Sequence, residues 1–472
     1  MNRSNFWIHI GLAVVLVTLA AVVGQIERWK SALKSSPART ERVDPAASGK
    51  SRGLAGTPEV LVRFKPGTGL DAIRAIASSR HDVVTDEIEA VSGLVEINDL
   101  EDASPEKVAA EYAALENVEY AEPNYRINLD DPASAAKRMD LVDRVGSAAT
   151  PNDPLFGDQW ALNNSGQDGG KAKADLGALQ AWEKTRGNSD VVIAVLDTGV
   201  DYTHVDLREN MWIRPANIPA YTDDELGSYN DLNGFNGTDQ TADPMDDNGH
   251  GTHCAGIIGA EGNNGEGITG INWKVKIMPL KFLGRGGFGN TDDAIEAINY
   301  AVDRKKKGVN IRVISASWGS TQRSKALEDT IKAAGEAGIL FVAAAGNDGS
   351  DNDSRPHYPS NYKLPNVISV AALDRNDKLA SFSNYGAETV HVAAPGKDIL
   401  STWLGEGYRE ASGTSMATPY VSGIAALVVA AEPSITLEDL RARIIDSVDK
   451  LDSLSGKVAS GGRICAEKAV GK

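Results

Sequence analysis

Cysteine is scarce in this sequence, and basic residues are outnumbered by acidic ones. The only cysteines among 472 residues are Cys254 and Cys465, so at most one disulfide bridge is possible, and neither a disulfide framework nor a paired-cysteine metal site fits. Lysine and arginine number 48 against 65 aspartate and glutamate residues, which gives a formal net charge of −17. This deficit argues against a nucleic-acid partner, because such a partner requires a basic face that replaces phosphate counterions.

The remaining composition is that of an ordinary globular protein. Hydrophobic residues make up 42% of the chain and charged residues 24%. The length is sufficient for two or three domains with a sizeable hydrophobic core. The acidic balance fits a soluble exported protein or a protein that binds cations.

A long apolar run lies at the N-terminus. Residues 6–24, FWIHIGLAVVLVTLAAVVG, contain a single ionisable side chain, His9. As a helix this run would span about 28 Å, close to the roughly 30 Å hydrocarbon core of a membrane, so a retained anchor is one interpretation. The basic leader and the small residues at the end of the run favour a signal peptide. We predict a signal peptide or N-terminal membrane anchor over residues 1–29, and a secreted, extracellular or periplasmic protein whose only membrane contact is this segment.

A small domain is predicted between two polar linkers, at residues 30–57 and 130–152. The domain itself covers residues 58–129. Its sequence alternates between strand patterns and helical patterns, in the order strand 59–64, helix 70–80, strand 93–98, helix 104–117 and an extended segment 118–125. This alternation predicts an α+β domain of ferredoxin-like type.

The pattern changes over residues 153–472, where continuous apolar strands are separated by helical stretches. The strands are predicted at 191–197, 276–283, 311–318, 339–347 and 367–373, with helices at 291–307 and 324–337. Apolar strands alternating with helices predict an α/β fold with a parallel sheet covered by helices on both faces. Functional groups in this architecture gather at the carboxyl ends of the strands.

Three motifs place an acid, a base and a nucleophile along this part of the chain. Asp197 ends the strand VVIAVLD, His250 begins HGTHCAGIIGA, and Ser415 lies in GTSMATP ahead of a long apolar run. Each residue has a structural alternative: a turn or cap aspartate, a hydrogen-bonding histidine, and a helix-capping serine. Together they form an Asp, His, Ser series in the chain order found in subtilisin, one of three unrelated orders for the same triad.

The blocks DTGVDYTHVDL, NGHGTHCAGIIG and GTSMATP resemble the three catalytic blocks of the subtilisin family of serine proteases, peptidase family S8. The resemblance covers about residues 153–472, and residues 58–129 resemble the inhibitory prodomain of the family. It implies that Ser415 attacks a carbonyl, that His250 moves the proton and that Asp197 orients His250. It also implies that Asn347 and the backbone N–H of Ser415 form the oxyanion hole.

The resemblance extends to the substrate groove. It implies that Ser317, Trp318 and Gly319 pair with an extended substrate, and that Ala344, Ala345 and Gly346 form one side of the primary specificity pocket. Trp318 replaces the usual leucine and is expected either to make the wall between subsites bulkier or to lie in the core. His357 aligns near the pocket floor, although the preceding loop differs in length from familiar members.

Calcium is the expected cofactor. Residues 261–270, EGNNGEGITG, resemble the calcium loop of thermitase-like members, and the lone thiol Cys254 resembles that of the thermitase and proteinase K branches. The alternative for the loop is a surface turn. A second acidic cluster, Asp239, Asp243, Asp246 and Asp247, is either another calcium site or a set of solvated charges. By the resemblance, the ligands of the loop site are Asp153, Asp206, Asn264 and the carbonyls of Glu261, Glu266 and Ile268.

The sequence therefore predicts an exported serine endopeptidase that hydrolyses peptide bonds through an acyl-enzyme and is made as an autoprocessed zymogen. We expect protein or peptide substrates, the prodomain as an intramolecular inhibitor, and a monomer. Self-cleavage is expected between about Asn128 and Asn152. The alternative is a catalytically silent binding protein on the same scaffold.

Overall fold

A computed structural model describes residues 60–101, 103–129, 150–223, 227–238 and 243–471. The predicted signal or anchor segment, the first linker and nearly all of the second linker lie outside these residues.

The N-terminal described region is a four-stranded antiparallel sheet with two helices. Its elements are β1 (Val60–Phe64), α2 (Leu70–Ser78), β2 (Asp82–Glu87), β3 (Leu94–Asp99), α3 (Pro105–Ala113) and β4 (Val118–Pro123). The strand order β2-β3-β1-β4 and the antiparallel pairing confirm the predicted ferredoxin-like fold. Strand β2 was not predicted, because DVVTDE is acidic and leaves Val83 exposed.

A nine-stranded sheet forms the centre of the larger domain. The strand order is β18-β19-β15-β14-β13-β12-β6-β10-β9, and the pairs are parallel except β18 with β19. In that order the strands are Val448–Lys450, Gly462–Ile464, Val392–Pro395, Val367–Leu373, Leu340–Ala344, Ile311–Ala316, Gly187–Asp197, Lys274–Lys281 and Phe235–Asn236. The predicted parallel α/β sheet is confirmed.

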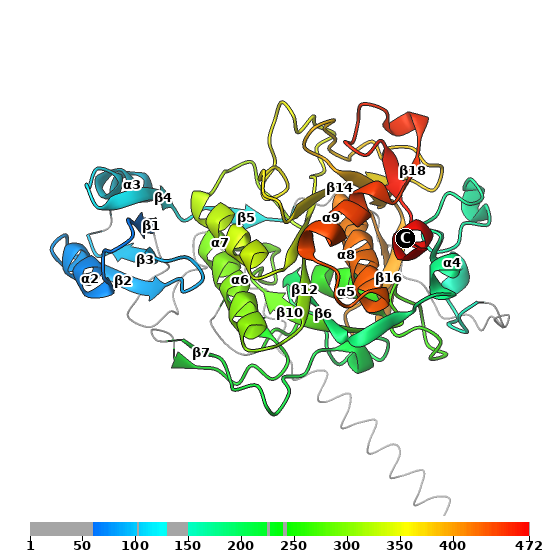
Figure 1. The fold of residues 1–472 in the computed structure, drawn as a ribbon, viewed down its shortest axis with the longest axis horizontal. Helices are drawn as coiled ribbons and strands as arrows, with labels where there is room; N and C mark the ends of the chain where they lie inside the picture. Colours follow the sequence, from blue (N-terminus) through cyan, green and yellow to red (C-terminus); the bar gives the residue numbers. More distant parts are fainter. Residues whose placement is uncertain (1–59, 102, 130–149, 224–226, 239–242, 472) are drawn as a thin grey trace, which may run out of the picture. The chain divides into compact units, whose positions relative to one another are not determined.

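Helices cover both faces of this sheet (Figure 1). The alternation along β6 shows why: Val191, Ile193 and Val195 pack into one apolar core, and the residues between them pack into the other. The first core includes side chains of α5 (His250–Gly259) and α8 (Thr414–Ala431), and the second includes those of α6 (Thr291–Lys306) and α7 (Lys325–Glu336).

The other elements of the larger domain are short. They are α4 (Ala178–Trp182), β7 (Thr222–Asp223), β8 (Gly227–Ser228), β11 (Phe288–Asn290), β16 (Ile399–Trp403), β17 (Gly407–Ala411), α9 (Leu437–Asp446) and α10 (Ala466–Gly471). A further strand, β5 (Arg126–Asn128), follows the small domain and pairs with β11.

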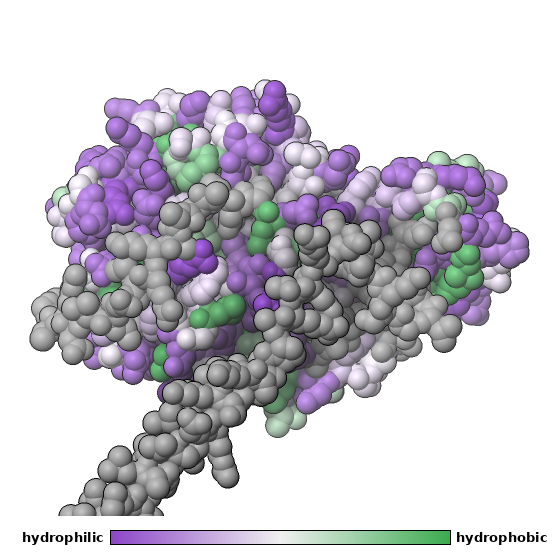
Figure 2. Space-filling model, turned by 180° about the vertical axis from the view of Figure 1, so that it is seen from behind, coloured by the Kyte–Doolittle hydropathy of each residue, from purple (hydrophilic) through white to green (hydrophobic). Residues whose placement is uncertain are grey.

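Helix α8 is long and apolar enough to cross a membrane, and it is the one helix of the described residues that meets this test. Its most apolar window is 89% buried inside the protein, so we assign it as a core helix. Close packing explains the single glycine within it: a Cβ at Gly423 would collide with the side chain of Ile271. On the face seen in Figure 2, hydrophilic side chains cover most of the coloured surface, and apolar ones appear in separate spots.

Candidate active site

Asp197 and His250 form a buried hydrogen-bonded pair at the carboxyl end of β6. The Nδ1–H of His250 donates to Oδ1 of Asp197 at 2.7 Å, and the same oxygen accepts from the backbone N–H of Thr198 at 2.7 Å. Asp197 is 0% exposed and His250 4% exposed. This arrangement holds the proton on Nδ1, so Nε2 is the ring nitrogen positioned to accept one.

The start of α5 is built to hold His250 in place. Gly249 has a φ of +111°, and a Cβ there would lie 2.5 Å from the ring of Trp403. Oδ1 of Asp246 accepts from the backbone N–H groups of Asn248 and Gly249 at 2.9 and 3.0 Å. Its Oδ2 accepts from the backbone and the hydroxyl of Thr252 at 3.0 and 2.6 Å. Asp246 therefore caps the helix that carries the base.

The acidic cluster around Asp246 is only partly described, since Asp239 lies outside the described residues. Asp246 is 5% exposed and uses both oxygens in hydrogen bonds, so it is not the solvated charge that was one of the two expectations. Asp247 pairs with Lys281 at 2.7 Å, and Asp243 accepts from the backbone of Met245 at 3.1 Å. These protein partners give the three residues structural roles.

Ser415 lies in the first turn of α8 and is 1% exposed. Its Oγ donates to the carbonyl oxygen of Ser317 at 3.0 Å, and the hydroxyl of Ser317 donates to the carbonyl of Ser415 at 2.9 Å. Ser317 directly follows β12, the neighbour of β6, so the hydroxyl of Ser415 lies at the sheet edge where Asp197 ends.

Cys254 connects the two helices of the site. It lies one turn after His250, and its Sγ is 3.5 Å from the carbonyl oxygen of Ser415. Ligand atoms of Asp197, His250 and Cys254 all lie within 4.8 Å of one another, a spacing that a metal ion could also use. We interpret the group as a hydrogen-bonded pair with a buried thiol behind it, because Nδ1 of His250 and Oδ1 of Asp197 are already joined by a direct 2.7 Å contact.

Asn347 follows β13 and faces the residue before Ser415. Its Oδ1 accepts from the backbone N–H and the hydroxyl of Thr414 at 2.8 and 3.0 Å. These two bonds orient the amide so that the Nδ2 donor is directed away from Thr414. Gly346, with a φ of +104°, forms the turn that presents Asn347.

The segment after β12 pairs with the end of the small domain. Gly319 forms an antiparallel bridge with Asn128, and β11 pairs with β5 on the other side. The N–H of Leu129 continues the pairing by donating to the carbonyl of Gly287 at 2.8 Å. An extended chain is thus held between β11 and the segment after β12, and that segment begins at Ser317, the hydrogen-bond partner of Ser415.

Trp318 takes the second of the two positions expected for it. The side chain is 1% exposed, donates through Nε1 to the carbonyl of Leu196 at 2.9 Å and packs on Phe282 with ring centroids 4.6 Å apart. The bulkier wall between subsites that its size suggested is therefore wrong, because the indole turns into the core beneath β6.

Comparison with known proteins identifies the family. The model of the subtilase family, peptidase S8, matches residues 188–461, and the model of the fervidolysin N-terminal prodomain matches residues 49–124. The chain belongs to the subtilase family.

The relatives of this subtilase carry the names of proteases. The thermophilic serine proteinase of Bacillus sp. strain AK1 is 39% identical over 367 residues, covering 77% of this chain and 76% of that protein. Thermitase of Thermoactinomyces vulgaris is 37% identical, covering 68% and 99%. The halolysin-like extracellular serine protease Nep of Natrialba magadii is 34% identical, covering 68% and 52%.

A solved structure agrees on the fold. Fervidolysin from Fervidobacterium pennivorans superposes with a TM-score of 0.68 at 24% identity, covering 90% of this chain and 62% of that one. The protein is thus a subtilisin-like serine endopeptidase with a prodomain, as the sequence predicted.

In this subtilase the prodomain contacts the catalytic domain through helix N-termini. The carboxylate of Glu122 accepts from the hydroxyl of Ser324 at 2.6 Å and from the N–H groups of Lys325 and Ala326 at 2.8 and 3.0 Å, which caps α7. Asn124 accepts in the same way from Asp292 at the start of α6, at 3.2 Å. Neither contact is predictable from the sequence, because each capping residue lies more than a hundred residues from its helix.

The residues expected to bind calcium gather around the 261–270 loop. Asp153 accepts from the N–H groups of Asn263 and Asn264 at 2.8 and 3.2 Å, and Asp206 accepts from Nδ2 of Asn264 and the N–H of Ile268 at 2.8 and 2.9 Å. Burial, followed for Asp206 by the charge of Asp153, raises the pKa of Asp153 to about 6 and that of Asp206 to about 7. Two close buried carboxylates fit a cation.

His357 lies between Gly319 of the expected substrate segment and Gly346 of the expected specificity pocket. A Cβ at Gly319 would collide with the imidazole of His357, and a Cβ at Gly346 would lie 3.0 Å from its Cδ2. The ring is 3% exposed. Ala344 and Ala345, also buried, precede Gly346 at the end of β13.

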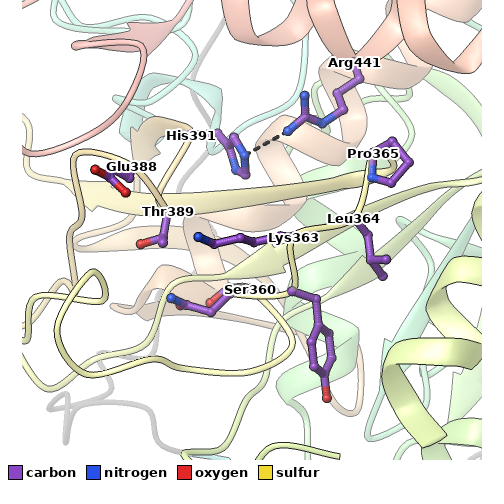
Figure 3. Close-up of a pocket in the computed structure, with 10 residues that line it drawn as sticks. Ser360, Lys363, Leu364, Pro365, Glu388, Thr389, His391 and Arg441 are labelled. Carbon is purple, nitrogen blue, oxygen red and sulfur yellow. Dashed lines mark hydrogen bonds between the residues drawn. The ribbon is translucent and has the colours of Figure 1, made fainter. Parts of the chain in front are cut away.

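A separate cavity of about 490 Å³ contains none of the predicted site residues (Figure 3). His391 accepts from the N–H of Ser369 at 2.9 Å, and Arg441 lies 2.9 Å from its Nε2. Burial and the charge of Arg441 lower the pKa of His391 to about 4. The imidazole is therefore neutral near pH 7, and we assign this pair a structural role.

Proposed function

We propose that Ser415, His250 and Asp197 act as nucleophile, general base and orienting acid. Ser415 Oγ attacks the carbonyl carbon of the scissile peptide bond, and its proton passes to Nε2 of His250. Asp197 holds Nδ1 and stabilises the imidazolium. His250 then returns the proton to the leaving amine as the C–N bond breaks, and a water attacks the acyl-enzyme by the same route. The 2.7 Å contact between His250 and Asp197 at the strand edge beside Ser415 is the observation that carries this proposal.

The oxyanion of the tetrahedral intermediate is stabilised by Nδ2 of Asn347 and the backbone N–H of Ser415. The orientation of the Asn347 amide, fixed through Oδ1 by Thr414, supports this assignment. A helix N-terminus adds positive potential at the same point, because the N–H groups of the first turn of α8 have no intrahelical partners.

Substrate binds as an added strand between residues 287–290 and Ser317, Trp318 and Gly319. The pairing of Asn128 with Gly319 and with Phe288 supports this geometry. Main-chain pairing recognises many sequences, so selectivity comes from pockets for individual side chains. Ala344, Ala345, Gly346 and the ring of His357 form the primary pocket in this proposal.

The prodomain inhibits by the same pairing. Residues 126–129 occupy the substrate strand position, and Ile127 is buried with 3% exposure. Glu122 and Asn124 fix the direction of this tail by capping α7 and α6. Self-cleavage between Asn128 and Asn152, mostly outside the described residues, then converts the zymogen into an inhibited complex.

A calcium ion bound by Asp153, Asp206, Asn264 and the carbonyls of Glu261, Glu266 and Ile268 stabilises the mature N-terminus. The raised pKa values of Asp153 and Asp206 support a cation, which would offset their charges. The ion supplies stability and not reaction chemistry, because it would tie residues 150–156 to the loop after α5.

Export and a monomeric state complete the proposal. The extracellular relative supports secretion, and the apolar run at residues 6–24 supplies the signal or anchor.

The experiment uses purified precursor free of other proteases. The Ser415→Ala precursor should remain uncut while the parent accumulates a product that begins between residues 129 and 153. Accumulation of mature Ser415→Ala protein would refute self-cleavage. If the parent hydrolyses no peptide once its prodomain has been removed, the silent binding protein is the better description.

A further inference from the structure

Five carboxylates meet where the prodomain contacts α6 and the β7 strand. Asp86, Glu89 and Glu96 come from the prodomain, and Asp223 and Glu296 come from the catalytic domain. Neither the triad nor the 261–270 loop uses any of them. Negatively charged groups of two domains are brought together at this point. Something must therefore offset the repulsion between them.

Three of these side chains converge on one point. One carboxylate oxygen each of Asp86, Asp223 and Glu296 lies within 4.8 Å of the others. Calcium binds oxygen at about 2.3–2.6 Å, so two ligands on opposite sides of one ion are about 4.6–5.2 Å apart, and closer in any other arrangement. The spacing of the three oxygens therefore matches a single coordination sphere.

Glu296 is the member that most needs a partner. It is 2% exposed, and its one side-chain partner among the described residues is the carboxyl group of Asp86, another acid. Its pKa is raised well above the usual value, first by burial and then by the charges of Asp86 and Glu96. Burying such a group is strongly unfavourable unless an opposite charge or hydrogen bonds compensate it.

Glu89 is the exposed member of the group. Its carboxylate accepts from Nδ2 of Asn299, whose Oδ1 accepts from the N–H of Ala90 at 2.9 Å. Glu89 therefore adds a fourth carboxylate near Asp223, on the solvent side of the group.

We propose that Asp86, Asp223 and Glu296 bind a divalent, oxygen-preferring cation of the calcium class that joins the prodomain to the catalytic domain. The site is complete only in the precursor or the inhibited complex, because the prodomain supplies Asp86. Departure of the prodomain leaves two carboxylates and releases the ion. The cation thus stabilises the inhibited state, independently of the 261–270 loop.

The test counts calcium ions in the intact Ser415→Ala precursor, whose length is verified by mass. Equilibrium dialysis measures the calcium bound to this parent, to its Glu296→Gln variant and to its Asp206→Asn variant. The Asp206→Asn variant is the matched control. We expect Glu296→Gln to bind one calcium fewer than the parent. The Asp206→Asn variant should keep the calcium ion at the new site. A precursor with both substitutions should therefore lose a second ion only if the 261–270 loop also binds one. Because the hydroxyl of Tyr221 lies 3.4 Å from Asp223, terbium in this site should show tyrosine-sensitised emission that Glu296→Gln abolishes.

A second variant, Asp86→Asn, keeps the test decisive if Glu296→Gln fails to fold. An unchanged calcium count in whichever of the two variants folds, as judged by circular dichroism, overturns the proposal. The proposal is also overturned if the Glu296→Gln precursor binds as many ions as its parent and is more stable than the parent in chelator. That result would mean that the carboxylates share protons and bind no cation. These results leave the triad untouched, since failure of the proposed function appears as cleavage of the Ser415→Ala parent.

Discussion

Replacing Glu122 by glutamine should weaken the inhibited complex far more than its exposure suggests. The carboxylate accepts three hydrogen bonds at the start of α7, at 2.6, 2.8 and 3.0 Å. Glutamine is nearly the same size and keeps one accepting oxygen, but it loses the charge and places an NH2 group against the N–H donors. In the released enzyme these donors bind water, so the cost falls on the complex.

The magnitude follows from these contacts. A hydrogen bond to a charged group contributes about 1.5–3 kcal/mol against about 1 kcal/mol for a neutral one, and a charge at a helix N-terminus adds about 0.3–1 kcal/mol. The glutamine oxygen keeps two of the hydrogen bonds but without the charge, so the free energy of prodomain binding should become less favourable by about 2–3 kcal/mol. This corresponds to an increase of about 30- to 150-fold in the dissociation constant of the prodomain.

The assay dilutes the self-processed complex and follows hydrolysis of a peptide substrate as the prodomain dissociates. Glu119→Gln is the matched control, because Glu119 lies on the same strand, has a 46% exposed side chain and contacts Arg63 of its own domain at 3.4 Å. The control should change the dissociation constant less than about fivefold, as expected for an exposed ion pair worth less than about 1 kcal/mol. Equal effects of the two substitutions would refute the capping argument.

Three other predictions concern the catalytic domain. Asn347→Ala should lower kcat by about 10²- to 10³-fold with little change in KM, the loss measured when the equivalent donor is removed from subtilisin itself, and steady-state kinetics would contradict the oxyanion role if KM alone changed. Cys254→Ala should retain activity within about tenfold, because the thiol is buried behind the triad and takes no part in proton transfer; complete loss in a folded variant would implicate the thiol. In the presence of a chelator, the melting temperature should decrease as the pH is raised from 5 to 8. Burial raises the pKa of Asp206 in the folded state to about 7, so above about pH 4 the folded state binds more protons than the unfolded state. Calcium or Asp206→Asn should flatten this dependence, and an unchanged slope in both would count against the loop site.

The sheet was predictable because its strands are continuous apolar runs. The predicted strand at residues 367–373 is β14 itself, and that at 191–197 is the buried end of β6. The hairpin of β16 and β17 was missed, since ILSTW and GYREA mix polar and apolar residues without a clear period. Strand β2 was missed for a similar reason, because its only two apolar residues, Val83 and Val84, are not fully buried.

The candidate catalytic residues were predictable because each lies in a recognisable sequence motif. The blocks around Asp197, His250 and Ser415 name the reacting groups, and the structure brings Asp197 and His250 into contact at the expected end of the sheet. The assigned roles of these residues stay predictions until kinetics test them.

Contacts between distant segments were beyond sequence reasoning. No sequence pattern near Glu122 indicates that it caps a helix 202 residues later. The convergence of Asp86 with Glu296 depends on the contact between the two domains. Asp246 looked like one charge in an acidic stretch, because only the folded chain shows that the N–H groups at the start of α5 surround it. The direction of the Trp318 side chain was undecidable for the same reason, as the space beneath β6 is formed by Phe282.

The most direct test of the triad is labelling with a fluorophosphonate probe, followed by mass spectrometry of the peptides. The processed enzyme should carry one adduct, on Ser415, and labelling should slow by orders of magnitude in Asp197→Asn, where the base lacks its orienting carboxylate. An adduct on another serine, or equal labelling rates in the parent and Asp197→Asn, would contradict the account.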